Sequence, residues 1–387
     1  MSASDLIDQT TALQLSGLPV ASNSTESTSS SNPVKSTPGL PTSPETSSTI
    51  SSVPQKSSKK PRKARIPLSG PPEEILSKNR TSAPQFWVDK TVKLAGKHWN
   101  DFYRNHQAVP FFKDRHWTQR EWDLESKLGG GEGKGKGKAI LETGCGTGAF
   151  IYPLLEIYPD ARFVGFDFAA KAVELTKGHA AHDTSKVHIF QHDLTEPPTA
   201  PSLAERLADV PPEFGAPINQ FDIVSHVFVL SALAPRNHAA AVKTLIGLLA
   251  PGGTLLLRDY ALHDEAQLRF HSLPSASYAT VPALLSAQTD SAASPSPAST
   301  SSPTSEVENS KTGNVSEANR PWYKRGDQTM TYFFTPEEVQ DLVDQACEDL
   351  GRKVEGGIEV VERKLENRAQ EWQCTRKFVH GSWTRIE

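Results

Sequence analysis

Cysteine is scarce in this sequence, since 387 residues include only Cys145, Cys347 and Cys374. They form neither a CxxC pair nor a closely spaced framework, so we expect no structural zinc site, no other metal site and no disulfide-stapled fold. This cysteine usage is typical of a reducing compartment. Runs of about 18 apolar residues are also lacking, which argues against a transmembrane helix.

An excess of positive charge and a targeting signal are lacking too. The net charge of -4 excludes a uniformly basic coat for nucleic acid and leaves room only for a local basic patch. The amino terminus carries Asp5 and Asp8 and has no basic segment followed by an apolar run, so no secretory signal is predicted. We therefore expect a cytoplasmic protein. The basic cluster KKPRKAR at 59–65 keeps the nucleus as an alternative.

Composition divides the chain into segments of different character. Residues 1–82 are rich in Ser, Thr and Pro and predict a disordered tail, because so little apolar surface can be buried. Residues 83–128 mix aromatic and basic side chains and predict helices that lie on the main domain. The Gly/Lys run at 129–138 lacks the Ser or Thr of a P-loop and precedes a strand, so it predicts a linker. Residues 139–387 form the main domain, with a low-complexity insertion at about 274–320.

Apolar strands alternate with helices through the main domain. Short apolar runs separated by helical patterns predict a parallel sheet covered on both faces. A Thr-Pro-Glu-Glu opening marks the start of the last helix. The predicted strands are 139–143, 162–168, 187–192, 221–230, 254–260, near 358–365 and 372–383, and the predicted helices are 149–158, 169–181, 237–249 and 335–350.

The most informative motif is LETGCGTGA at 141–149, a glycine loop between a strand and a helix. Glycine suits such a loop because the backbone turns tightly and approaches a nucleoside closely. Asp167 ends the second strand, at the spacing of a carboxylate that accepts hydrogen bonds from ribose hydroxyls, although it is also placed to cap the next helix. Asp193, in QHDL, is a candidate acceptor for an adenine amino group.

The glycine loop leaves two cofactor classes open. It satisfies Gly-x-Gly-x-x-Ala, so an NAD-dependent dehydrogenase is one alternative. The segment LAPGGTL at 249–255 is similar to the lead into the fifth strand of Rossmann-like methyltransferases, which favours S-adenosyl-L-methionine. The predicted fold class is therefore α/β: a class I methyltransferase with a seven-stranded, mostly parallel sheet, helices on both faces and an amino-terminal helical extension.

A set of longer motifs resembles one family, the tRNA N(3)-methylcytidine methyltransferases. The resemblance runs from Trp99 to Trp383, interrupted by the Ser-rich insertion. Matches of this length in one order are hard to explain by a shared fold alone. The motifs are HWNDFY at 98–103, FFKDRHW at 111–117, VLSA at 229–232, RDY at 258–260, QLRF at 267–270, YKRGD at 323–327 and YFF at 332–334.

The resemblance implies an enzyme that methylates N3 of a cytidine in tRNA, at position 32 of the anticodon loop. It implies a tRNA partner and, for some relatives, an aminoacyl-tRNA synthetase such as the seryl enzyme. The site residues fall into three groups. The implied cofactor-binding residues are Trp99, Tyr103, Gly144, Gly146, Asp167, Asp193, Leu194 and Val227. Asp259 is the candidate catalytic carboxylate, with a brace beside Arg258 as its alternative role. The candidate RNA-binding residues are Lys113, Arg115, His116, Arg269, Arg325 and Arg368.

Some positions depart from the family pattern. Gln328 and Met330 stand where the family has Gly and Arg, and Ala261 follows the RDY motif where Gly is usual. Because these positions lie where RNA is expected, recognition is expected to differ more than chemistry. Three alternatives stay open: a methyltransferase of another RNA, of a protein or of a small molecule; a non-catalytic RNA-binding scaffold with this fold; and the dehydrogenase.

Overall fold

The computed structural model describes residues 68–78, 83–106, 113–195, 201–272, 278–280, 321–367 and 372–387. Several expectations fall outside these ranges: the tail up to residue 67 with its basic cluster, most of the insertion at about 274–320, and Arg368. Among the described residues, no helix is long and apolar enough to cross a membrane.

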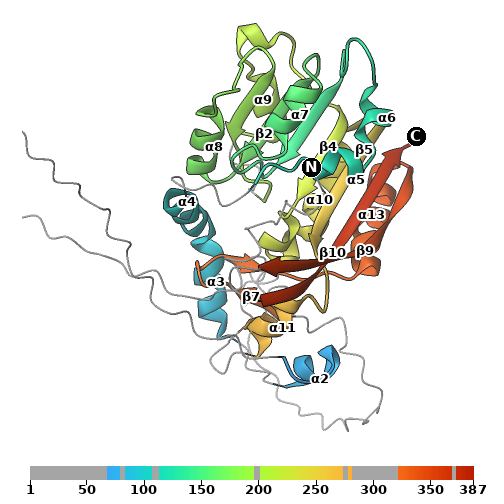
Figure 1. Cartoon of the computed structure of the whole chain (residues 1–387). Coiled ribbons are helices and arrows are strands. Elements are labelled where there is room, and N and C mark those ends of the chain that lie inside the picture. Colours follow the sequence, from blue (N-terminus) through green and yellow to red (C-terminus); the bar gives the residue numbers. More distant parts are fainter. Residues whose placement is uncertain are drawn as a thin grey trace, which may run out of the picture. The chain divides into compact units, whose positions relative to one another are not determined.

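Seven strands form the central sheet, in the order β3-β2-β1-β4-β5-β10-β9. Strands β1 to β5 pair in parallel, whereas β10 is antiparallel to both β5 and β9. In Figure 1 the dark red β10 lies between β5 and β9. The strands are β1 (Ala139–Thr143), β2 (Arg162–Asp167), β3 (Val187–Gln191), β4 (Phe221–Val227), β5 (Leu249–Tyr260), β9 (Val354–Asn367) and β10 (Trp372–Arg385).

The strand order decides between the two cofactor classes. Dinucleotide-binding folds have an all-parallel sheet of order 3-2-1-4-5-6. Here an antiparallel strand is inserted beside β5 instead, and this arrangement confirms the methyltransferase fold. The predicted strand positions are confirmed, but several strand ends differ; β9, for example, begins at Val354 and not near residue 358. Strand β4 stops at Val227 because Phe228 adopts a left-handed φ of 61°, and β5 already begins at Leu249.

Helices cover both faces of the sheet, and each strand sends alternate side chains to the two sides. Leu141 of β1 belongs to the core cluster that contains Leu245 and Val343, from α10 (His238–Gly247) and α13 (Pro336–Leu350). Its neighbour Ile140 packs in the other cluster with Leu154 of α7 (Ile151–Ile157). Side chains of a parallel strand alternate in this way, so both faces are apolar and both are buried.

The predicted amino-terminal helices are α3 (Gln85–Lys93), α4 (Ala95–Asn105), α5 (Trp117–Glu121) and α6 (Leu124–Leu128). They divide between two places on the main domain. Helix α4 packs against α8 (Ala170–Lys177), as Figure 1 shows, whereas Leu124 and Leu128 of α6 join the core on the α7 face. Smaller elements that were not predicted are α2 (Pro72–Ser77), α9 (Leu203–Ala208), α11 (Glu265–His271) and the sheet of β6 (Tyr278–Thr280), β7 (Pro321–Lys324) and β8 (Met330–Thr331). Helix α2 corrects the prediction of a disordered tail as far as residue 82, and β6 lies within the predicted insertion.

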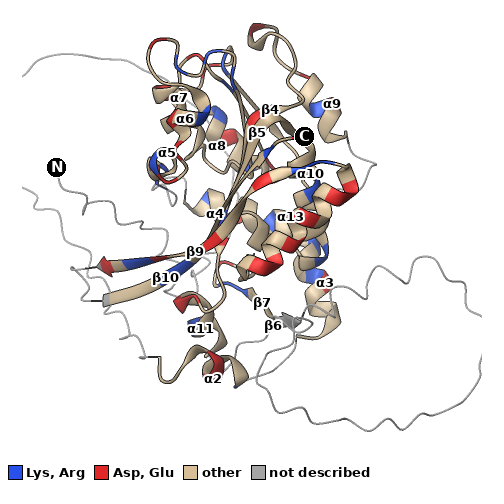
Figure 2. Cartoon of the chain, turned by 90° about the vertical axis from the view of Figure 1, so that its right-hand side faces the viewer, with Lys and Arg blue, Asp and Glu red and all other residues tan. Residues whose placement is uncertain are grey.

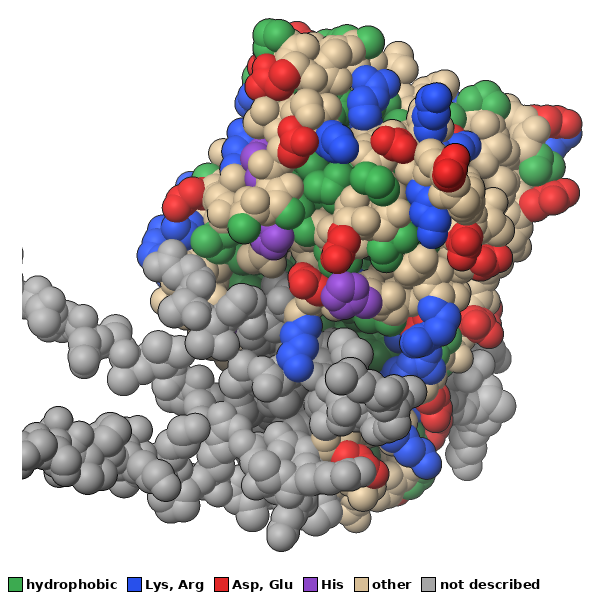
Figure 3. Space-filling model, turned by 45° about the horizontal axis from the view of Figure 1, so that its top comes forward, with side chains coloured by type: hydrophobic (Ala, Val, Ile, Leu, Met, Phe, Trp, Pro, Cys, Tyr) green, Lys and Arg blue, Asp and Glu red, His purple; other side chains and the backbone are tan. Residues whose placement is uncertain are grey.

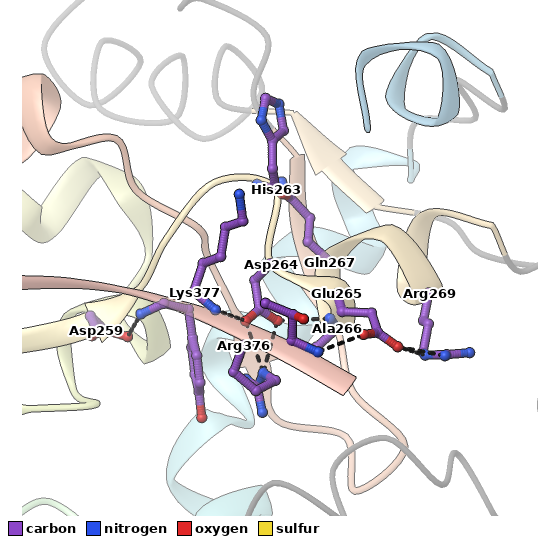
Figure 4. Close-up of polar contacts among 11 residues, drawn as sticks. Asp259, His263, Asp264, Glu265, Ala266, Gln267, Arg269, Arg376 and Lys377 are labelled. Atoms are coloured by element: carbon purple, nitrogen blue, oxygen red, sulfur yellow. Dashed lines mark hydrogen bonds and ion pairs between the residues drawn. The ribbon is translucent and has the colours of Figure 1, made fainter. Parts of the chain in front are cut away.

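A buried ion pair ties the segment after β5 to β10. Arg376 is 1% exposed, and its Nε donates to both oxygens of Asp264, at 3.0 Å and 2.8 Å. The same carboxylate caps α11 at Ala266 and accepts from the backbone N–H of Lys377, as Figure 4 shows. A buried charge is tolerated only when it is paired and hydrogen-bonded, and this carboxylate meets both conditions. The contact holds the half of the β9–β10 hairpin nearer its turn against the segment after β5.

Candidate active site

A cavity of about 570 Å³ opens where the parallel strands end. This edge of a parallel α/β sheet is where such folds bind ligands, and the volume lies within the usual range for small-molecule sites. The structure brings together there all eight cofactor residues that the sequence predicted. These are Trp99, Tyr103, Gly144, Gly146, Asp167, Asp193, Leu194 and Val227.

The glycine loop lines the cavity, and two of its glycines have left-handed backbone. Gly144 has a φ of +62° and Gly146 a φ of +56°, and residues other than glycine rarely adopt such values. A Cβ on Gly144 would lie 2.5 Å from Val229, and one on Gly146 would lie 3.0 Å from the Tyr103 hydroxyl. A larger residue at either position would therefore collide with a neighbouring side chain, whereas glycine lets the backbone of the loop face the cavity.

Asp167 holds the start of α8, and its contact with ribose hydroxyls stays a prediction. One carboxylate oxygen accepts from the backbone N–H of Gly146 at 3.0 Å, and the other from that of Ala169 at 2.9 Å, just before α8. Burial is the larger influence and raises the pKa of Asp167 to about 6, while these two hydrogen bonds oppose the rise. Asp167 thus ties the glycine loop to the start of α8 and still lines the cavity.

Asp193 and Leu194 follow β3 and line the same cavity. One Asp193 oxygen accepts from both the backbone N–H and the hydroxyl of Thr195, at 2.8 Å and 2.7 Å. This turn fixes the carboxylate and directs one oxygen to Thr195, which leaves the other oxygen to accept from a ligand amine. The pairing of a fixed acceptor with an apolar neighbour suits the edge and face of a purine.

Helix α4 closes one side of the cavity with Trp99 and Tyr103, both of which are buried. The helix is held in place by Asn100, whose side-chain oxygen accepts from the backbone N–H of Lys171, in the first turn of α8, at 2.8 Å. The first turn of a helix has N–H groups without partners inside the helix, so a cap supplied by another helix links the two. The guanidinium of Arg325 lies 5.4 Å from the centre of the Trp99 ring.

Arg115 faces the cavity rather than open solvent. Its side chain is 11% exposed, it lines the cavity, and it contacts Glu142 of β1 at 3.2 Å. Burial raises the pKa of Glu142 to about 8 although the Arg115 guanidinium opposes the rise, so Glu142 retains its proton more readily than an exposed carboxyl. The second oxygen of Glu142 is buried and lacks a hydrogen-bond partner among the described residues, and Glu142 itself is not among the residues that line the cavity.

Phe228 is a residue of the cavity that the sequence did not single out. It lines the wall beside Val227, has a φ of 61°, and stacks on Tyr260 with ring centroids 5.1 Å apart. A bulky side chain in left-handed backbone is strained, and such residues concentrate at functional sites. Its position directly after β4 was visible in the sequence, but its conformation was not.

The candidate catalytic carboxylate occupies a different place from the one expected. Asp259 is fully buried, it is not among the residues that line the cavity, and its two oxygens accept from the backbone N–H groups of Ser231 and Tyr260. Burial raises its pKa to about 6. Asp259 therefore braces the turn after β4. The expected pairing with Arg258 is wrong in detail, because Arg258 forms its ion pair with Glu121 instead.

The predicted RNA-binding residues separate into exposed and internal ones. Lys113 and His116 are exposed near the amino-terminal end of α5. Arg269 pairs with Glu265 at 2.6 Å, and Arg325 is buried, with its Nε donating to Thr329 at 2.8 Å. The placements of Arg115 and Arg325 correct the idea of a continuous basic track through these positions. Whether any of the six contacts RNA stays a prediction.

The cavity suits S-adenosylmethionine. A nucleoside needs carboxylate acceptors and a close backbone, which Asp167, Asp193 and the glycine loop offer, and the methionine carboxylate needs a positively charged partner, which Arg115 offers. No cluster of three or more His, Cys, Asp or Glu side chains suited to a metal occurs within the described ranges.

Known proteins give the same assignment. Residues 141–255 match a family model described as a methyltransferase domain. The tRNA N(3)-methylcytidine methyltransferase trm141 of Schizosaccharomyces pombe is 28% identical over 305 residues, covering 78% of this chain and 96% of that protein. The tRNA N(3)-cytidine methyltransferase METTL2 of Danio rerio is 30% identical over 346 residues, covering 80% and 79%. Human METTL6, also named a tRNA N(3)-cytidine methyltransferase, is 37% identical over 208 residues, covering 54% and 67%.

The sheet order, the glycine loop and the family model together define a class I methyltransferase that uses S-adenosyl-L-methionine. The relatives match 54% to 80% of this chain, which is more than the residues covered by the family model. The chain belongs to the family of tRNA N(3)-methylcytidine methyltransferases.

Proposed function

We propose that this protein methylates N3 of a cytidine in tRNA, and that the cytidine is at position 32 of the anticodon loop. The observation that carries the proposal is the cavity lined by all eight expected cofactor residues, in a chain of this family. The position within the tRNA is the finer part. It is supported by the motifs HWNDFY, which lies in α4, and YKRGD, which begins in β7, together with the sequence motif FFKDRHW.

The chemistry requires positioning more than acid–base catalysis. S-adenosylmethionine, when bound, supplies a methyl group on a cationic sulfur, and the in-plane lone pair of cytosine N3 displaces S-adenosylhomocysteine to give cationic 3-methylcytidine. Neutral N3 has no proton to lose before it attacks, so the protein has to align two reactants and stabilise charge. The placement of Asp259 agrees with this requirement, since both of its oxygens are engaged by backbone N–H groups.

Phe228 is the residue on which we expect the cytosine to pack. Its ring lines the cavity at the end of β4 and is backed by Tyr260 and Phe378, with centroids 5.1 Å and 5.5 Å away. An aromatic face held by neighbouring rings stacks an unpaired base at little entropic cost. A loop cytidine is also easier to turn out than one in a duplex.

We expect the RNA to approach over α3 and β7. Lys93 lines the cavity, Lys90 is exposed one turn earlier, and Lys324 of β7 is close enough to Lys90 for its pKa to be lowered, mainly by burial and also by that neighbouring charge. We expect the RNA to avoid the surface of helix α13, because negative charge there repels phosphates. Figure 2 shows that this surface is acidic, and it is made by Glu337, Glu338, Asp341, Asp344, Glu348 and Asp349.

The proposal also includes an accessory protein partner and a cellular compartment. An aminoacyl-tRNA synthetase, such as the seryl enzyme, is the partner that we propose for delivering the tRNA. We place the reaction in the cytoplasm on the basis of cysteine usage, with the nucleus as the alternative offered by residues 59–65.

The decisive experiment is methyl transfer from labelled S-adenosylmethionine to total tRNA, followed by nucleoside analysis and mapping of the modified position. We expect 3-methylcytidine at position 32. The variant Gly144→Ala should lose at least about tenfold in rate, because its Cβ would meet Val229 at 2.5 Å. Gly129→Ala is the matched control, since Gly129 also has a positive φ, of +84°, but nothing within 4 Å of its Cβ.

The outcomes separate the parts of the proposal. 3-Methylcytidine at another position would overturn the anticodon-loop assignment alone. A different methylated product, or none after the seryl-tRNA synthetase is added, would overturn the tRNA cytidine assignment. Equal losses in Gly144→Ala and Gly129→Ala would show that backbone strain, and not the cavity, controls the rate.

A further inference from the structure

Arg206 is a cavity residue that neither the glycine loop nor the family motifs account for. It lies on α9, in the stretch between β3 and β4, and it lines the same cavity as Asp193 and Leu194. Its Nε is buried and has no hydrogen-bond partner among the described residues. A buried donor without an acceptor costs free energy, so the site is incomplete as it stands.

The backbone around Arg206 is well fixed. Helix α9 begins with a capping box, in which the Ser202 side chain accepts from the backbone N–H of Glu205 and the Glu205 carboxylate accepts from that of Ser202. Leu207, next to Arg206, is buried in the core cluster that includes Phe190. The helix that carries Arg206 is therefore firmly placed beside the cavity.

The position of α9 identifies which part of the cavity Arg206 faces. The backbone carbonyl of Arg206 lies 3.4 Å from Nε2 of His188, and His188 belongs to β3. The same strand leads directly to Asp193 and Leu194, the residues suited to the edge and face of the adenine. Arg206 thus enters the cavity from the side where the purine is expected.

We propose that Arg206 is a further cofactor-binding residue, whose guanidinium donates a hydrogen bond to an acceptor nitrogen of the adenine. The acceptors of adenine are its unprotonated ring nitrogens, whereas Asp193 serves the amino group, so the two residues are complementary. The planar fork of a guanidinium presents several donors, and the buried Nε of Arg206 is one that no described residue engages. The proposal rests on the cofactor assignment but not on the identity of the RNA.

The test is the affinity of the full-length protein for S-adenosylhomocysteine and for adenosine, measured by calorimetry. Arg206→Leu, which retains bulk but has no donors, should weaken both ligands by about ten- to a hundredfold. Arg206→Lys should lose less, because one donor remains. Arg120→Leu, at an exposed arginine of α5, is the matched control and should leave both affinities unchanged.

Thermal melting of each variant separates a binding defect from unfolding, since the Leu and Lys variants should melt within a few degrees of the parent protein. Unchanged affinity of a folded Arg206→Leu for both ligands would overturn the proposal. So would a loss confined to an anticodon stem-loop RNA, which would make Arg206 an RNA contact instead. If the adenine ligands respond as expected while no tRNA is methylated, the proposed function fails and this inference stands.

Discussion

Asp167 shows how one side chain links loop geometry to ligand binding. Its two oxygens hold the backbone N–H groups of Gly146 and Ala169, and its burial raises its pKa to about 6. The ionised form is the one that accepts hydrogen bonds from ribose hydroxyls. A bound nucleoside therefore favours the carboxylate over the protonated acid, and binding and titration of Asp167 are linked.

We predict that affinity for S-adenosylhomocysteine falls as the pH drops below about 6. Protonation of Asp167 removes the acceptor, so the dissociation constant should rise about tenfold between pH 7 and pH 5. The neighbouring Asp193 carboxylate favours protonation further, by repulsion. Calorimetric titrations at pH 5, 6 and 7 measure the effect.

Asp167→Asn separates this group from the other ionisable residues of the cavity. The variant should bind more weakly at pH 7 and should lose most of the dependence on pH. A variant that retained the full tenfold change would assign the titration to another residue.

At the scale of helices, α4 and α8 form one unit across the cavity. Asn100 of α4 supplies the acceptor for the first turn of α8, and the same side chain donates to the carbonyl of Gly96 at 2.8 Å. Trp99 and Tyr103 lie beside it on α4 and line the cavity. The position of the aromatic wall therefore depends on a contact between elements 71 residues apart in sequence.

We predict that Asn100→Ala weakens binding of S-adenosylhomocysteine by roughly fivefold, because loss of a helix cap costs about 1 kcal/mol. Thr335→Ala is the matched control. Thr335 caps α13 by accepting from the backbone N–H of Glu338, and no residue of α13 lines the cavity. It should lower the melting temperature without changing the affinity. Equal affinities for the two variants would contradict the role of α4 as a wall.

Local patterns predicted the elements and the glycine loop, but not how distant elements meet. The β1 strand and the loop after it are adjacent in sequence, so their geometry follows from residues 139–149. Asn100 and α8 meet only because the chain returns to the same place, and nothing near Asn100 signals that contact. Arg206 was missed for the same reason, since the stretch between β3 and β4 carries no recognisable motif. Asp259 was misplaced because its partners are backbone groups.

The molecule as a whole carries charge of both signs, and the sign differs from one surface to another. Figure 3 shows Lys and Arg side chains interspersed with Asp and Glu on one face. Against this background, the exposed lysines of α3 near the cavity and the acidic surface of α13 differ in sign. A basic patch beside an acidic surface is compatible with the net charge of -4, which leaves room only for a local basic surface.

We predict a modest salt dependence of tRNA binding that arises largely on the α3 side. The double variant Lys90→Ala, Lys93→Ala should reduce the slope of log K against log salt by about 1 to 2, because a complex with fewer phosphate contacts releases fewer counterions. Lys243→Ala is the control, since Lys243 pairs with Asp349 of α13 at 2.8 Å. Filter binding between 50 and 200 mM salt, roughly the range in which such contacts weaken, measures both. A larger change in the control would place the RNA on the α13 side.

Strand β10 has a consequence for the order in which the protein folds. It follows every other strand of the sheet along the chain, yet it lies inside the sheet, paired with β5 from Thr254 to Tyr260 on one edge and with β9 on the other. During synthesis, β5 ends at Tyr260 and its neighbour begins only at Trp372, so one row of backbone N–H and C=O groups of β5 stays unpaired in the meantime. Until then, the segment around Leu255 and Leu257 must not pair with another strand. A chain whose synthesis stalls before residue 372 has an incomplete sheet.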